Sequence, residues 1–323
     1  MSIIAINPKK ESQINPDNLL GYLEFHSIPD LRIHKADLAT LWAKHSLSNE
    51  FLPGEIRACD AYRRATAKTT QTVTVNWRGG QYTAKLMVRE LKSNAQEIVR
   101  LLVREVLDTK NEVLDYAVVG KMTFSRDQET MSIRAEYGYL NEFDYQMVLD
   151  QTVSTFNHYV SYHTRDTVRN IINKVIRSTN PVRIMPRSQG KFVPKRCHGT
   201  LLSLQALLRD IEAYANNQDC CLDIIPIVDT AEQRQLVTRR VKAELGAEMD
   251  ELVSELAEQL KTVDKSISIE TAQRMAQRAQ DIQQRALEYE KMLNVRLTVL
   301  RSQLMEFINR TKVIADESQH MVS

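Results

Sequence analysis

The chain has 323 residues, of which 43% are hydrophobic and 26% charged, and its formal net charge is +2. This balance is typical of a globular protein and excludes an intrinsically disordered chain. The length suits one large domain or two ordinary ones. No stretch approaches the roughly 20 apolar residues that cross a bilayer, and residues 1–18 lack signal-peptide features, so we expect a cytoplasmic protein with no membrane partner.

The first part of the chain, residues 1–69, is expected to be mostly helical, with a short helix that carries Leu38, Leu41 and Trp42 on one face and a second helix after Pro53-Gly54. From residue 70 onward the hydrophobic pattern changes to period two, which indicates strands. We expect a ββαββ unit in which one helix packs on an antiparallel sheet. Its predicted elements are strands at 70–77 and 82–88 around a turn at Gly79-Gly80, a helix at 95–106, and strands at 117–124 and 131–137.

A long helix is predicted from about residue 142 to 176, because apolar residues keep helical spacing there and Asn180-Pro181 follows. The order hairpin, helix, strand then recurs. Its predicted elements are strands at 182–185 and 191–193, a helix at 199–215 and a strand at 222–228. This recurrence allows an internal ββαβ duplication, which rests on the order of the patterns alone. We therefore place an α+β core at residues 70–230.

Apolar residues then recur every three or four positions from Leu245 to Val263 and from Met275 to Ile308, after a helix cap at Asp229-Thr230. Repeats this long are typical of coiled coils. A polar break at 264–268, where Ser266 or Ser268 could cap a new helix, predicts an antiparallel coiled-coil hairpin. We assign residues 231–318 to this arm and 319–323 to a tail. The second helix is longer, so part of its stripe is expected to contact the core, a partner protein or a second copy of the chain through Leu293, Leu297, Leu300, Leu304 and Ile308.

The segment from residue 160 to 200 is strongly basic, with nine Lys or Arg residues against one acid, Asp166. Positive potential of this kind attracts phosphate backbones. Tyr159 and Tyr162 come just before it, and single-strand binders combine stacking rings with basic grooves. The alternative is that these rings belong to the core and the cations pair with the acidic arm. The candidate DNA- or RNA-binding cations are Arg165, Arg169, Lys174, Arg177, Arg183, Arg187, Lys191, Lys195 and Arg196.

Metal ligands and catalytic motifs are not evident in the sequence. Structural zinc sites typically pair cysteines as CxxC, because two thiolates must converge on one ion. The four cysteines, Cys59, Cys197, Cys220 and Cys221, form no such pair and no secreted disulfide framework. GxxxxGK, GxGxxG and GxSxG motifs are also missing. We expect no metal, no cofactor and no catalytic residues, although many enzymes carry no readable motif.

Two passages together resemble an uncharacterised family. They are DAYRRAT at residues 60–66, after Leu52-Pro53, and GKFVP at 190–194 with IPIVDT at 225–230. They are similar to proteins of unknown function from prokaryotes, their viruses and their mobile elements. The likeness spans residues 50–240. It implies a bacterial or phage context and brings no activity and no functional residue with it.

We therefore predict an α+β fold with antiparallel sheets, followed by a coiled-coil hairpin. The leading interpretation of function is a non-catalytic interaction protein that self-associates or docks partners through the arm and contacts nucleic acid through residues 160–200. One alternative is an enzyme or nuclease accessory with an unrecognised site in the α+β core. Another is a structural filament or shell subunit.

Overall fold

The computed structural model describes residues 18–139, 141–185, 189–216, 219–262 and 268–322. It is 53% helical and 28% strand, with antiparallel sheets and a C-terminal helical hairpin, which confirms the predicted α+β class. The chain divides into two compact units. Unit 2 comprises residues 30–41 and 52–168, and unit 1 comprises the described residues of 1–29, 42–51 and 169–323.

A five-stranded antiparallel sheet in the order β3-β4-β5-β6-β7 forms the centre of unit 2. Arg78 and Gly79 join β3 to β4, and both have positive φ angles, of 47° and 80°. Two such residues in succession are typical of a two-residue type I′ hairpin turn, which lies one residue before the predicted position. The strands are β3 Gln71–Trp77, β4 Gly80–Ser93, β5 Glu97–Leu107, β6 Val113–Ser125 and β7 Thr130–Ala135.

Strand β5 occupies the position of the helix predicted at 95–106, so that prediction is wrong. Ile98, Leu102 and Val106 are four residues apart, which fits a helix. A strand that is buried on both faces also reads as a continuous apolar run, and the spacing cannot separate the two. β5 pairs with β4 on one side and β6 on the other. Without this helix the order hairpin, helix, strand occurs once in the described chain, and the predicted duplication is not found.

Helices α2 (Ala58–Ala67) and α3 (Tyr145–Ser161) share one hydrophobic core with this sheet. The Tyr62 hydroxyl of α2 donates a hydrogen bond of 2.9 Å to the carbonyl oxygen of Met122 in β6. From α3, the Phe156 ring packs edge-on against a β6 phenylalanine at 6.0 Å between ring centroids. These contacts fix both helices on the apolar face of the sheet.

The long helix predicted over residues 142–176 is interrupted. Its two parts are α3 and α4 (Arg165–Ser178), and the strand β8 (Tyr162–Thr164) separates them. β8 pairs antiparallel with β2 (Arg32–His34), which precedes helix α1 (Lys35–Lys44). β8 contains an aromatic and a β-branched residue, and such residues favour strands once a partner strand is present.

A second antiparallel sheet, in the order β11-β1-β10-β9, belongs to unit 1. Its central strand β1 (Leu19–Ser27) lies in the region predicted to be mostly helical, and that prediction is wrong for these residues. Gly21 is required in β1 by close packing, because a Cβ atom there would lie 2.4 Å from the carbonyl oxygen of Val193. Helix α5 (His198–Ala215) packs on this sheet through Leu201. The other strands are β9 Val182–Arg183, β10 Lys191–Pro194 and β11 Cys221–Val228, and 3₁₀ turns lie at Asn49–Phe51, Tyr137–Tyr139 and Lys195–Cys197.

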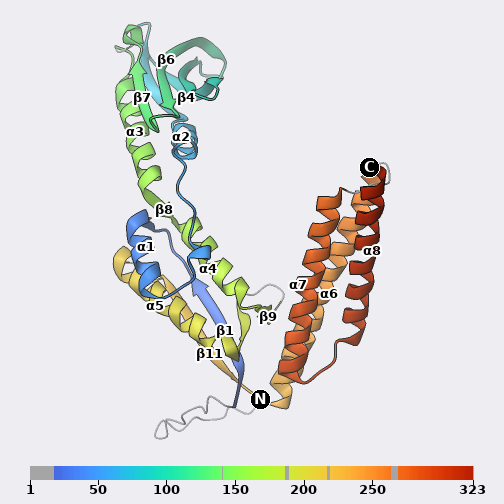
Figure 1. Cartoon of the computed structure of the whole chain (residues 1–323). Coiled ribbons are helices and arrows are strands. Elements are labelled where there is room, and N and C mark those ends of the chain that lie inside the picture. Colours follow the sequence, from blue (N-terminus) through green and yellow to red (C-terminus); the bar gives the residue numbers. More distant parts are fainter. Residues whose placement is uncertain (1–17, 140, 186–188, 217–218, 263–267, 323) are drawn as a thin grey trace, which may run out of the picture. The chain divides into compact units, whose positions relative to one another are not determined.

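The arm contains three helices, and Figure 1 shows them side by side. Asn294 ends the second of them in the left-handed conformation, with φ 54°, which is a common way for a helix to stop. The prediction of one continuous helix from the break to the C-terminus is therefore wrong. The apolar stripe hid this turn because Leu293 and Leu297, on either side of it, are both buried. The helices are α6 Ala231–Thr262, α7 Ile269–Leu293 and α8 Thr298–Val322.

Two predicted helix caps are confirmed. The Thr230 hydroxyl oxygen accepts a hydrogen bond of 3.2 Å from the backbone N–H of Gln233 at the start of α6. The Ser268 hydroxyl oxygen accepts one of 3.2 Å from the N–H of Thr271 at the start of α7. The rest of the predicted break, with Ser266, lies outside the described residues.

The arm is joined to the unit 1 sheet by a common hydrophobic core. Leu20 of β1, Val182 of β9 and Phe192 of β10 belong to the same buried cluster as the arm leucines. The Tyr289 hydroxyl of α7 also donates a 2.6 Å hydrogen bond to the carbonyl oxygen of Asn180. These contacts bring α6 and α7 beside the segment that was predicted to bind nucleic acid.

Candidate interaction surfaces

Helix α4 carries a row of exposed cations, which we call the basic face: Arg169, Lys174 and Arg177. At about 100° per residue, the three lie within an arc of roughly 140°, together with Asn170 and Asn173. The opposite side of α4 is buried and consists of Val168, Ile171, Ile172, Val175 and Ile176. This division explains why the cations of α4 point to solvent.

The basic face is not neutralised by the protein itself. Within the described part of the chain, no carboxylate forms a salt bridge with the three cations or with the exposed Arg183 of β9. The alternative that these cations pair with the acidic arm holds for Arg196, whose Nη2 lies 2.5 Å from Oε2 of Glu288. Lys195 is half-buried, and Arg187 lies outside the described residues.

The two predicted stacking tyrosines belong to unit 2, whereas the cations from Arg169 onward belong to unit 1. The Tyr159 ring is covered by Arg64 and Lys68, whose charged groups lie 5.0 and 5.3 Å from its centroid. Tyr162 stacks on His158 at 4.6 Å. Both rings therefore already have partners within unit 2.

Arg165 is the one candidate cation of α4 that belongs to unit 2. Its backbone N–H donates a 3.1 Å hydrogen bond to the carbonyl oxygen of Leu31, and its side chain is half-buried. We therefore do not include Arg165 in the basic face.

A cleft of about 290 Å³ lies where the end of α4 and strands β9 and β10 meet helices α6 and α7. We call it the cationic cleft. Three of its residues were predicted from the sequence, and Arg285 of α7 was not, because the arm helices show no basic cluster that would single it out. The cleft is lined by Arg177, Asn180, Pro181, Arg183, Lys191, Glu244, Glu248 and Arg285.

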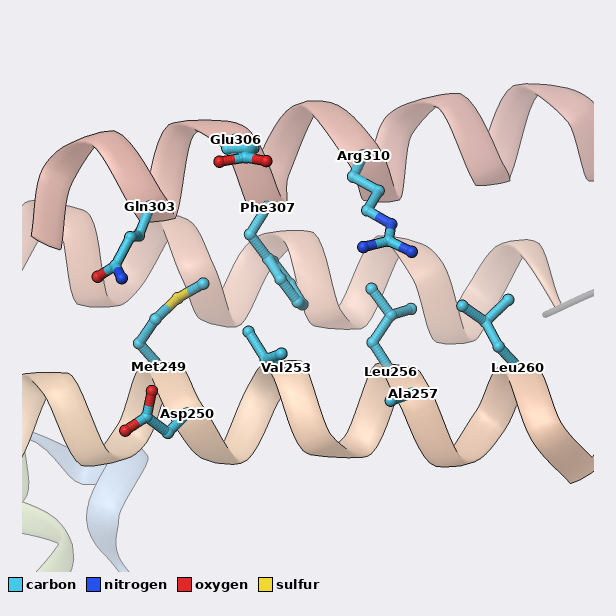
Figure 2. Close-up of a pocket in the computed structure, with 10 residues that line it drawn as sticks. All are labelled: Met249, Asp250, Val253, Leu256, Ala257, Leu260, Gln303, Glu306, Phe307 and Arg310. Carbon is cyan, nitrogen blue, oxygen red and sulfur yellow. The ribbon is translucent and has the colours of Figure 1, made fainter.

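A second hollow, of about 260 Å³, lies between α6 and α8, and we call it the arm groove. Figure 2 shows Phe307 of α8 pointing toward the α6 side chains. The groove floor is apolar, and Val253 on α6 is 47% exposed. The rim is polar and carries both signs of charge. The lining residues are Met249, Asp250, Val253, Leu256, Ala257, Leu260, Gln303, Glu306, Phe307 and Arg310.

The apolar stripe that was predicted to bind a partner lies inside the arm and not on its surface. Its five residues lie in the core formed by the three arm helices, and each is buried within the chain: Leu293, Leu297, Leu300, Leu304 and Ile308. The third helix, which the sequence did not reveal, supplies the cover that a two-helix arm would lack. Self-association therefore needs another surface.

Candidate metal ligands do not converge in the described residues, where no group of three or more His, Cys, Asp or Glu side chains could hold an ion. Burial raises the pKa of the Cys220 thiol to about 12, and it also raises the pKa of the Cys197 and Cys221 thiols. These three thiols are therefore protonated near neutral pH. None of the described helices is long and apolar enough to cross a membrane.

The fold and these surfaces define a two-unit α+β protein with a helical arm. The model of a family of unknown function, DUF6744, matches residues 19–319, so the chain belongs to that family. This confirms the resemblance to an uncharacterised family and extends it beyond residues 50–240. No curated protein and no solved structure matches the chain.

Proposed function

We propose that this chain is a non-catalytic interaction protein whose basic face contacts the phosphate backbone of nucleic acid. The observation that carries the proposal is the row of exposed cations on α4 that no carboxylate of the described chain neutralises. Cations of this kind bind phosphates by releasing condensed counterions, without regard to base sequence. Asn170 and Asn173 add hydrogen-bonding groups to the same face.

Binding should depend steeply on salt. With about four phosphates neutralised by the basic face and Arg183, log K is expected to fall against log salt with a slope of about −3 to −4 on duplex DNA, and less on a single strand. Fluorescence anisotropy with labelled oligonucleotides at several salt concentrations measures this slope. The double substitution Arg169→Glu and Lys174→Glu should weaken binding to all sequences alike and reduce the slope by about two.

A matched control variant changes the net charge by the same amount on another helix, away from the basic face. Arg239 and Lys261 are exposed on α6, so Arg239→Glu with Lys261→Glu should leave the affinity nearly unchanged. Equal weakening by both double variants would mean that net charge alone governs binding, and the basic face would have no specific role. No binding at low salt would overturn the proposal and favour an enzyme or a structural subunit instead.

We further propose that the arm groove is covered by a second copy of the chain. In a twofold contact the same surface meets itself, so a surface that carries both signs of charge can pair its acids with its bases. The groove rim has this property, because Asp250 and Glu306 accompany Arg310. The apolar floor supplies the surface that such a contact would bury.

Self-association can be tested by analytical ultracentrifugation at tens of micromolar protein. Val253→Glu places a charge in the groove and should shift the protein to monomer. Val313 of α8 is 54% exposed and does not line the groove, so Val313→Glu is the matched control and should leave the dimer intact. A monomeric unmodified protein, or equal effects of the two variants, would contradict this use of the groove.

A further inference from the structure

The cationic cleft is built from residues that lie far apart in the chain. Arg177 comes from the last turn of α4, Arg183 from β9 and Lys191 from β10, while the arm supplies Arg285 from α7 and two glutamates from α6. Four cations thus line the cleft together with two carboxylates. A third carboxylate, the buried Glu24 of β1, lies opposite Lys191 in the sheet and acts on it, so the excess is about one positive charge.

Both α6 carboxylates already have partners. Glu248 accepts two hydrogen bonds from Arg285 Nη1, at 3.0 and 2.7 Å. Glu244 Oε2 accepts a 2.7 Å hydrogen bond from the backbone N–H of Arg183, which leaves the Arg183 side chain unused. Among the described residues, the Arg177 and Arg183 guanidinium groups have no carboxylate partner.

Among the described residues, Lys191 is the most enclosed of the cleft cations that form no salt bridge. Its ammonium group donates one long hydrogen bond, of 3.4 Å, to Asn173 Oδ1. Burial lowers the pKa of Lys191, Glu24 and Glu244 oppose that effect, and the positive charges of Arg183 and Arg177 add to it. An ammonium group in this setting gains from an anion that supplies both charge and hydrogen-bond acceptors.

We propose that the cationic cleft binds a phosphate monoester group. A monoester carries a charge of about −1.5 to −2 near neutral pH and three acceptor oxygens. Among the described residues, three cleft cations, Arg177, Arg183 and Lys191, form no salt bridge, so each can meet one of these oxygens, whereas a backbone diester offers one charge and two free oxygens. An arginine guanidinium group can donate two parallel hydrogen bonds to two oxygens of the same phosphate. The cleft volume of about 290 Å³ lies at the lower end of small-ligand sites, so it suits a terminal phosphate or a mononucleotide.

The same group can come from the 5′ end of a nucleic-acid strand or from a free nucleotide. The first source rests on the proposed function, and the second does not. The experiment therefore has two arms. The first compares a 5′-phosphorylated oligonucleotide with its 5′-hydroxyl form by fluorescence anisotropy, both labelled at the 3′ end. The second titrates adenosine monophosphate and, as its control, adenosine by isothermal calorimetry.

The cleft variant is Arg177→Gln with Arg183→Gln, which removes two exposed side chains and keeps the backbone hydrogen bond to Glu244. The matched control is Arg169→Gln with Lys174→Gln, which removes two charges from the basic face outside the cleft. We expect the 5′ phosphate to strengthen binding by about tenfold or more, because each charged hydrogen bond contributes at about that level. The cleft variant should lose this preference, and the control should keep it while binding both oligonucleotides more weakly.

The outcomes separate the two proposals. Equal affinity for the two oligonucleotides, with no binding of adenosine monophosphate, overturns the cleft proposal and leaves the basic face intact. Adenosine monophosphate binding that the cleft variant abolishes, without oligonucleotide binding, supports the cleft and overturns the nucleic-acid proposal. If both variants keep the preference for the 5′-phosphorylated oligonucleotide, the phosphate binds elsewhere and the cleft proposal is overturned. Circular dichroism melts of both variants verify that they remain folded.

Discussion

Replacing Leu304 with aspartate is expected to unfold the helical arm. Leu304 lies on α8 with 0% of its surface exposed, inside the core that the three arm helices share with the unit 1 sheet. An unpaired carboxylate at this position would lose its hydration without gaining a partner, at a cost of several kcal/mol. Chemical denaturation followed by circular dichroism should show a large loss of stability or an arm that no longer folds.

The neighbouring residue provides the control. Met305 is on the same turn of α8 and is 53% exposed, so Met305→Asp introduces the same charge into water. Its effect on the free energy of unfolding should stay within about 0.5 kcal/mol. If the two variants were equally stable, α8 would not pack with the face that the structure assigns to it.

The second large effect on the free energy of unfolding is expected for a change at Arg104, a fully buried cation in β5. Its guanidinium lies 2.7 Å from an Asp115 oxygen and 3.0 Å from a Glu142 oxygen, and it covers the Tyr139 ring at 5.3 Å. Arg104→Met keeps much of the volume but leaves two carboxylates without their cation. Because 37% of the Asp115 side chain and 19% of the Glu142 side chain are exposed, water replaces part of the lost pairing. We therefore expect a loss of about 1–3 kcal/mol, which a urea unfolding curve would show.

Arg134 on the edge strand β7 is exposed, so Arg134→Met removes the same charge from the same sheet and should change stability little. A stable Arg104→Met variant would instead mean that burying the guanidinium costs more than its ion pairs return. In that case the network would not hold β5, β6 and the segment before α3 together.

Much of the fold follows from local signals. The hairpin at residues 71–93 was predicted because period-two strands flank a glycine turn, and α5 was predicted because its leucines recur at helical spacing. β1 and β5 were missed for one reason. Both are strands in which consecutive residues are buried, as in strands covered on both faces, so their apolar residues do not alternate with polar ones. Only the partner strands, which the sequence does not identify, distinguish such a segment from a helix.

The residues of the cationic cleft were predicted only in part, because some of them come together only through tertiary packing. Charge density along the chain identified Arg177, Arg183 and Lys191, because a run of cations is visible in one segment. Arg285 and the two glutamates come from the arm and reach the cleft only through tertiary packing. The end of α7 did leave a local signal, since Asn294 follows a leucine at a position where asparagine often stops a helix.

The central place of β1 has a consequence for how the protein is made. β1 is the first described strand, yet its partners are β10, from residue 191, and β11, which ends at residue 228. All of unit 2 is inserted between β1 and these partners. During synthesis on the ribosome, the unit 2 meander can pair as it emerges, because each strand follows its neighbour. β1 must wait unpaired until β10, at residues 191–194, has left the exit tunnel, and it gains its second partner only with residue 228. The nascent chain therefore carries an unpaired strand for more than half of its translation.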